Sequence, residues 1–115
     1  CALPNSWQAS SIGLTLNHRG ESISSRPLSA SEPVSGQMTL VAWNYTLTGP
    51  TPAGLRVRLC SLTRCAEIEG QSGITQAFNG VSAQEPLRFI WEVPGGGRLI
   101  PALKVQRNEV LVNYR

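Results

Sequence analysis

The chain has 115 residues, a length typical of one domain, and a hydrophobic content of 41% that suffices for a buried core. Its 11 Gly and 8 Pro favour short elements joined by turns over a helical bundle. The net charge of +3 is spread along the chain, so the dense basic stretch of a nucleic-acid binder is missing. No run approaches the ~18–20 apolar residues of a membrane span. We therefore expect neither a nucleic-acid partner nor a transmembrane segment.

The N-terminal third carries weak signals. Alternation of apolar and polar residues over positions 10–16 predicts a first strand. Residues 1–6 before it are expected to form a flexible N-terminal segment. Residues 19–35 are rich in serine and contain Pro27 and Pro33, so they predict a long connection with at most a short edge strand.

Two clear strand signals follow, separated by a Gly/Pro-rich break at residues 49–54. The stronger covers residues 38–47, where one face carries Val41, Trp43, Tyr45 and Leu47. The second covers residues 55–60, with apolar residues at alternate positions and Arg56 and Arg58 on the outward face. One face of this second strand is therefore expected in the core and the other in solvent.

Cys60 and Cys65 enclose four residues, a spacing typical of a β-hairpin loop whose flanking positions face each other. We expect a disulfide between them, and with it an oxidising compartment. Two reduced cysteines are the alternative. A zinc site is disfavoured, because Cys1 and His18 are the only further Cys or His ligands in the sequence.

After the cysteine pair, residues 66–69 are expected to return as a short partner strand, followed by a Gly/Ser-rich crossing at residues 70–73. Residues 87–93 predict a strand with Phe89 and Trp91 on its buried face. A loop at residues 94–97 ends it, because Pro and three Gly cannot continue a central strand.

The C-terminal residues predict a hairpin, in which strands 98–105 and 109–114 are joined by a turn at 106–108. About seven short strands without a convincing helix favour an all-β fold. The expected architecture is a single-domain β-sandwich over residues 1–115, of immunoglobulin-like shape and with a short cystine hairpin. A small barrel is the alternative. The aromatic core is expected to contain Trp43, Phe89 and Trp91.

Catalytic chemistry has little to build on in this sequence. All seven acidic residues are Glu, and His18 is the only histidine. Because no nucleophile–base pair is evident, we expect no enzyme, no cofactor and no metal site. The glycine run at residues 95–97 is followed by a strand signal instead of a helix, which disfavours a phosphate-binding loop.

Two features are candidate partner-binding sites. The outward-facing Arg56, Arg58 and Arg88 form a basic face if their strands share one sheet, and such a face suits bidentate hydrogen bonds to acidic groups of a protein. A bare exposed loop is the second, comprising Gly95, Gly96, Gly97 and the neighbouring Arg98. The alternative for the arginines is a solvated exterior that contributes only solubility.

Four blocks of the sequence resemble the FlhE family of flagellar proteins from enteric bacteria. They comprise residues 13–20, 38–43, 49–60 and 86–105, the last of which reads PLRFIWEVPGGGRLIPALKV. The resemblance implies a periplasmic protein made with a cleaved signal peptide and serving the flagellar type III export apparatus. It further implies a role in swarming motility and in limiting proton leakage, and a chaperone-like sandwich similar to a pilus-chaperone domain. Its expected partner is a flagellar rod, hook or export-gate component.

Cys1 leaves a different function open. It is compatible with a lipid-modified N-terminal cysteine, with a free thiol, or with a boundary that simply falls there. Lipidation of Cys1 would favour the alternative function, a lipid-anchored or secreted structural or adhesive surface domain.

Overall fold

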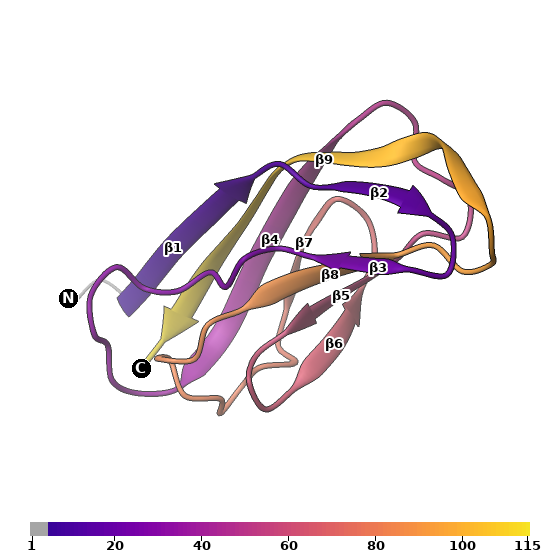
Figure 1. Ribbon diagram of the computed structural model, residues 1–115. Coiled ribbons are helices and arrows are strands. Elements are labelled where there is room, and N and C mark those ends of the chain that lie inside the picture. The colour runs from indigo at the N-terminus through magenta and orange to yellow at the C-terminus, as the bar shows by residue number, and fades with distance from the viewer. Residues whose placement is uncertain (1–4) are drawn as a thin grey trace.

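The computed structural model describes residues 5–115, which form strands and loops without a helix. Two antiparallel sheets stack face to face (Figure 1). The strands are β1 (Asn5–Ile12), β2 (Thr15–His18), β3 (Ser22–Ser24), β4 (Met38–Thr48), β5 (Arg56–Cys60), β6 (Cys65–Ile68), β7 (Ser72–Thr75), β8 (Arg88–Glu92) and β9 (Arg98–Tyr114). One sheet has the order β1-β9-β4-β7, with β2 also paired to β9, and the other has the order β3-β8-β5-β6. The predicted all-β sandwich is confirmed.

The core lies between the sheets and is centred on aromatic side chains. Trp91 is fully buried; its ring stacks on Phe89 at a centroid distance of 5.3 Å and meets Tyr45 edge-on at 5.6 Å. Trp43 is also buried and stacks on Tyr45. These contacts confirm the predicted core positions of Trp43, Phe89 and Trp91. Buried rings of this size contribute strongly to the hydrophobic stabilisation of a small sandwich.

The N-terminal strand differs from its prediction. The expected strand over residues 10–16 is instead two strands, β1 and β2, separated at Gly13 and Leu14, whose φ angles are +87° and +122°. β1 begins at Asn5 and pairs with β9 along its whole length. Residues 5 and 6 therefore belong to the sheet, and the prediction that they are part of a flexible segment is wrong. Residues 1–4 of that predicted segment lie outside the described residues.

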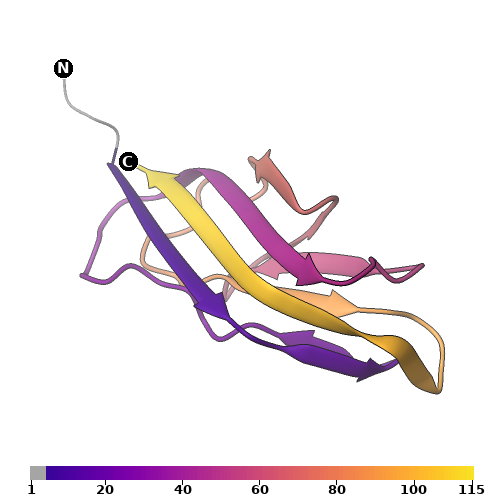
Figure 2. The same cartoon turned by 90° about the horizontal axis from the view of Figure 1, so that it is seen from above.

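The predicted C-terminal hairpin is wrong, because β9 is one strand of 17 residues. Figure 2 shows it running along the length of the molecule. Thr46 pairs with Arg107 and Leu47 pairs with Val105, so Gln106 is the extra residue of a β-bulge. Inward-facing residues are odd-numbered before the bulge and even-numbered after it. This change of parity mimics the interruption that a turn would cause.

Two short edge strands complete the sheets. β3 confirms the short edge strand expected between residues 19 and 35, with Ile23 paired to Trp91. β7 was not predicted, because Ser72–Thr75 lacks apolar alternation. Its Gly73 pairs with Trp43 and lies beneath the indole ring. β7 and β6 form the edges of the two sheets on the same side of the sandwich.

Candidate functional site

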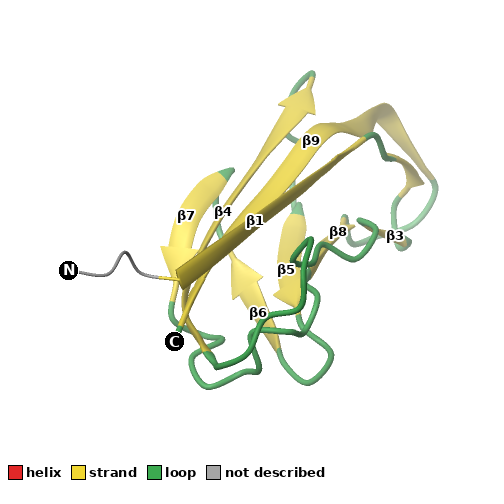
Figure 3. Ribbon diagram, turned by 90° about the vertical axis from the view of Figure 1, so that its left-hand side faces the viewer, coloured by secondary structure: helices red, strands yellow, loops and turns green. Residues whose placement is uncertain are grey.

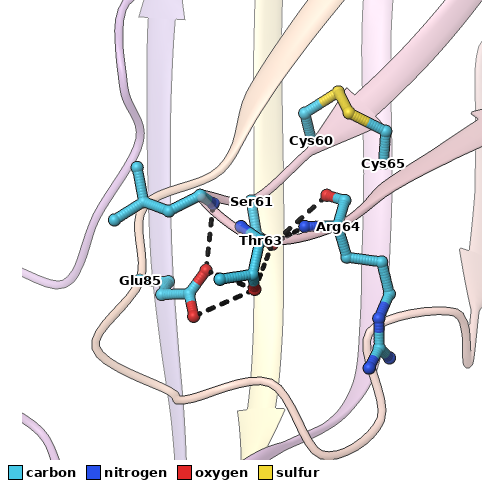
Figure 4. Close-up of a disulfide and its surroundings, with 7 residues drawn as sticks. Cys60, Ser61, Thr63, Arg64, Cys65 and Glu85 are labelled. Atoms are coloured by element: carbon cyan, nitrogen blue, oxygen red, sulfur yellow. Dashed lines mark hydrogen bonds between the residues drawn. A yellow bond between two sulfur atoms is a disulfide. The ribbon is translucent and has the colours of Figure 1, made fainter.

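The cysteine pair forms the predicted disulfide. Cys60 and Cys65 are directly opposed in the β5–β6 ladder and are bonded to each other (Figure 4). The side chain of Ser61 folds back over the loop, where its hydroxyl accepts hydrogen bonds from the Thr63 and Arg64 amides at 3.2 and 3.0 Å. The cystine therefore closes a hairpin loop that is already hydrogen-bonded internally.

Residues from a distant loop hold the tip of this hairpin. The Glu85 carboxylate accepts hydrogen bonds from the Leu62 amide at 2.9 Å and from the Thr63 hydroxyl at 3.1 Å (Figure 4). On the other side, the Arg64 guanidinium donates to the carbonyl of Ala77 at 2.9 Å. The tip is thus attached at both sides, while the Leu62 side chain remains 70% exposed.

The three candidate arginines lie in one sheet, as the prediction of a shared face required. Arg56 and Arg58 are on β5, and Arg88 is on the adjacent β8, where its Cα is opposite Cys60. All three are exposed. The Arg56 guanidinium contacts the Glu67 carboxylate at 2.7 Å, and this hydrogen bond raises the pKa of Arg56.

This face is mixed in charge and not uniformly basic. A depression of about 250 Å³ on it is lined by Arg56, Arg58, Glu67 and Glu92. Both partners of the Arg56–Glu67 ion pair are more than half exposed, so the pair contributes little to stability. Arg58, Arg88 and Glu92 are the charges of this face that no ion pair engages among the described residues.

The glycine loop is anchored more firmly than its composition indicates. Gly97 accepts a hydrogen bond from the Arg19 amide, and Val93 accepts one from the Gly20 amide, both at 2.8 Å. A Cβ at position 20 would lie 2.5 Å from the Gly95 carbonyl oxygen, so the turn at residues 19–20 is in close contact with the glycine loop. A Cβ added at position 96 would meet nothing within 4 Å. Arg88 is the first residue of β8, whereas the glycine loop follows the last residue of that strand. Arg98 is the first residue of β9, which belongs to the other sheet. The two predicted sites are therefore separate surfaces.

A cavity on the β6/β7 side of the sandwich was not predicted from the sequence. It has a volume of about 540 Å³ and lies between the loop at 51–55 and the turn at 68–71, with Tyr45 and Val57 also lining it. Burial raises the pKa of the Tyr45 hydroxyl. The Gly/Pro-rich break at 49–54 was visible in the sequence, but its approach to residues 68–71 depends on the tertiary fold.

A polar cluster on the outer face of the larger sheet was also missed. The Glu109 carboxylate accepts hydrogen bonds from Asn44 of β4, at 3.0 Å, and from Gln8 of β1. Arg107 adds an ion pair at 3.3 Å. These hydrogen bonds, that from Asn44 foremost, hold the pKa of Glu109 below its ordinary value. Scattered polar residues on three strands give no sequence signal of such a cluster.

Other functional residues considered from the sequence do not form a site. His18 is exposed and lies 3.6 Å from Glu21. Among residues 5–115, no group of three or more His, Cys, Asp or Glu side chains is placed to hold a metal ion. That part of the chain also contains no helix long and apolar enough to cross a membrane. The candidate lipidation site Cys1 lies outside the described residues.

Comparison with known proteins relates the chain to flagellar proteins. The family model described as "Flagellar protein FlhE" matches residues 13–115. The flagellar protein FlhE of Escherichia coli strain K12 is 77% identical over 109 residues, which cover 95% of this chain and 84% of that protein. The Yersinia enterocolitica FlhE protein is 39% identical over 113 residues, or 96% of this chain and 81% of its own length.

A solved structure agrees with the fold described above. The structure titled "Crystal Structure of FLHE" superposes with a TM-score of 0.95 at 69% sequence identity, and the match covers 99% of both chains. The sequence matches and the structural match agree, and the chain belongs to the FlhE family of flagellar proteins.

Proposed function

We propose that this chain is a periplasmic accessory protein of the flagellar type III export apparatus, with a chaperone-like role. Membership of the FlhE family supports a flagellar role. The Cys60–Cys65 disulfide is the observation that carries the location, because structural disulfides persist in oxidising compartments such as the periplasm. A flagellar protein with such a disulfide is best suited to the part of the assembly that lies outside the cytoplasm.

The proposed action is binding to a rod, hook or export-gate component while the flagellum is assembled. Bound there, the protein limits proton leakage through the export channel and thereby supports swarming. The exposed arginines support binding to a partner surface that contains acidic groups. Arg58 and Arg88 are the stronger candidates for this contact, because Arg56 already binds Glu67.

Crosslinking in flagellated cells tests this proposal. The wild-type chain should crosslink to a rod, hook or export-gate component in the periplasm. A folded variant with Arg56→Glu, Arg58→Glu and Arg88→Glu should lose most of this product and reduce swarming. Reversal of three charges elsewhere, Arg26→Glu, Lys104→Glu and Arg115→Glu, is the matched control.

Two outcomes would contradict parts of the proposal. If no flagellar component is crosslinked under conditions in which the chain is periplasmic, the proposed function is wrong. If both triple variants crosslink and swarm as the wild type does, the partner-binding surface lies away from the arginine face.

A further inference from the structure

β4 extends beyond the strand that pairs with its outer edge. The β4–β7 ladder ends at Asn44, opposite Ser72, and one further hydrogen bond joins the Tyr45 amide to the Gln71 carbonyl at 2.8 Å. On its other side, β4 stays paired with β9 as far as Thr48. Figure 3 shows β4 continuing past the end of β7. Residues 46–48 therefore have a strand on one side only.

The backbone of Leu47 faces this open side. Successive residues of a strand direct their N–H and C=O groups to alternate sides, so Leu47 points its groups the same way as Tyr45 does. The Tyr45 amide points toward the β7 side, because it is bonded to Gln71 there. The chain bends at Gly70 and Gln71, between β6 of the other sheet and β7. Leu47 therefore presents a donor and an acceptor in the position where an added strand would bond.

The open edge of β4 is short, and it carries no guarding side chain. The Arg26 guanidinium donates to the Ser10 carbonyl at 3.3 Å, so a residue of the loop after β3 engages one backbone acceptor on the edge of β1. Edge strands are commonly guarded by charged residues such as Lys, or by Pro, which prevent pairing. Thr46, Leu47 and Thr48 carry none of these. The edge of β4 at residues 46–48 is thus a competent pairing template.

The cavity of about 540 Å³ described above adjoins this edge. Tyr45 belongs to both, since it is the last residue of β4 bonded toward β7 and it also lines the cavity. The apolar lining of the cavity includes Pro52, Leu55, Val57 and Ile68. Among the described residues, Glu69 is the one charged residue that lines it. The cavity can therefore accept an apolar side chain that has a basic neighbour.

We propose that the edge of β4 at residues 46–48 binds an extended segment of a flagellar rod or hook subunit as an added strand; this inference rests on the proposed function. The segment continues the line of β7 and bonds to the Leu47 backbone. It places an apolar side chain in the cavity and a basic side chain beside Glu69. Main-chain hydrogen bonds supply affinity in this mode, and the cavity supplies specificity.

Amide hydrogen exchange with purified monomeric rod and hook subunits tests the site. Binding should slow exchange of the Leu47 amide. Leu47→Pro removes that donor and should weaken binding by up to about tenfold, as for one lost hydrogen bond. Glu69→Lys should weaken it independently through charge. The matched control is Ile74→Pro in β7. Trp43 directs its backbone groups toward β7, as Tyr45 does, so the residue opposite it, Gly73, faces β4 and the amide of Ile74 faces away from β4.

The outcomes separate this inference from the proposed function. If a subunit binds but Leu47 is not protected, or if Leu47→Pro and Glu69→Lys both bind as the wild type does, the site is wrong and the function stands. If Leu47 is protected without a subunit and in proportion to protein concentration, a second copy occupies the edge and the inference fails. If neither subunit binds, the rod-or-hook partner and this site are both wrong. Glu69→Lys keeps the test decisive if Leu47→Pro does not fold.

Discussion

Gly73 lies so close to Trp43 that a Cβ at position 73 would be 2.7 Å from the indole Cζ2 atom. The two residues are directly paired between β7 and β4, and the indole covers the glycine. Trp43 is buried on its other side by the aromatic core, so it has little room to move. A side chain at position 73 would therefore displace a core residue.

We predict that Gly73→Ala destabilises the protein by about 1–3 kcal/mol, as overpacking of a core does. Urea denaturation measures the change in the free energy of unfolding. Gly96→Ala is the control, because a Cβ there meets nothing within 4 Å. Equal stability of the two variants would show that Trp43 yields easily and that β7 is not packed as described.

The disulfide should contribute measurably to stability. Replacing both Cys60 and Cys65 by Ser should cost about 2 kcal/mol in the chain-entropy model for so short a loop. The wild type treated with reductant should lose the same amount, whereas the double variant should be insensitive to reductant. Thiol titration of the native, non-reduced protein should leave Cys60 and Cys65 unreactive; two reactive thiols at these positions would contradict the disulfide.

Trp91 should be a packing residue and not a ligand contact. Its side chain is fully buried, so Trp91→Ala should cost about 3–5 kcal/mol of unfolding free energy. Leu62→Ala, at the exposed tip of the cystine hairpin, should change stability by less than about 0.5 kcal/mol. A Trp91→Ala protein with wild-type stability but impaired partner binding would place Trp91 in a site instead of the core.

We predict that the free energy of unfolding depends on pH through Glu109. Its pKa is lowered by hydrogen bonds from Asn44 and Gln8, so the folded state favours the ionised form. The stabilisation is fully present above the ordinary glutamate pKa of about 4.3 and is lost as the pH falls through the lowered value. Denaturant unfolding between neutral and acid pH should show a wild-type advantage over Glu109→Gln that disappears at the acid end. A constant difference across this range would contradict the assignment.

The sequence predicted those strands that have a regular alternation. The buried aromatic residues of β4 and β8 fall at every second position and include Trp43 and Trp91, so period-2 patterning identified the strands and their buried faces. The local spacing of Cys60 and Cys65 likewise sufficed for the disulfide. These features depend on neighbouring residues, which a single sequence displays.

Features that depend on residues distant in the sequence were missed. The bulge at Gln106 reverses the parity of β9, and only its pairing with β4 distinguishes that bulge from a turn. β7 is a strand because Gly73 fits under Trp43, although its own residues carry no apolar pattern. Glu67 and Glu92 come to lie among the predicted arginines through strand pairing, which composition alone does not reveal.

The cytoplasmic pH of flagellated cells in acidified medium tests the central claim most directly. Cells that lack this protein should acidify more than wild-type cells, because protons leak through the export channel. Expression of the chain with an export signal should restore the pH, and expression of the same chain retained in the cytoplasm should not. An unchanged cytoplasmic pH in the deletion strain, or full restoration by the retained chain, would contradict a periplasmic protein that limits proton leakage.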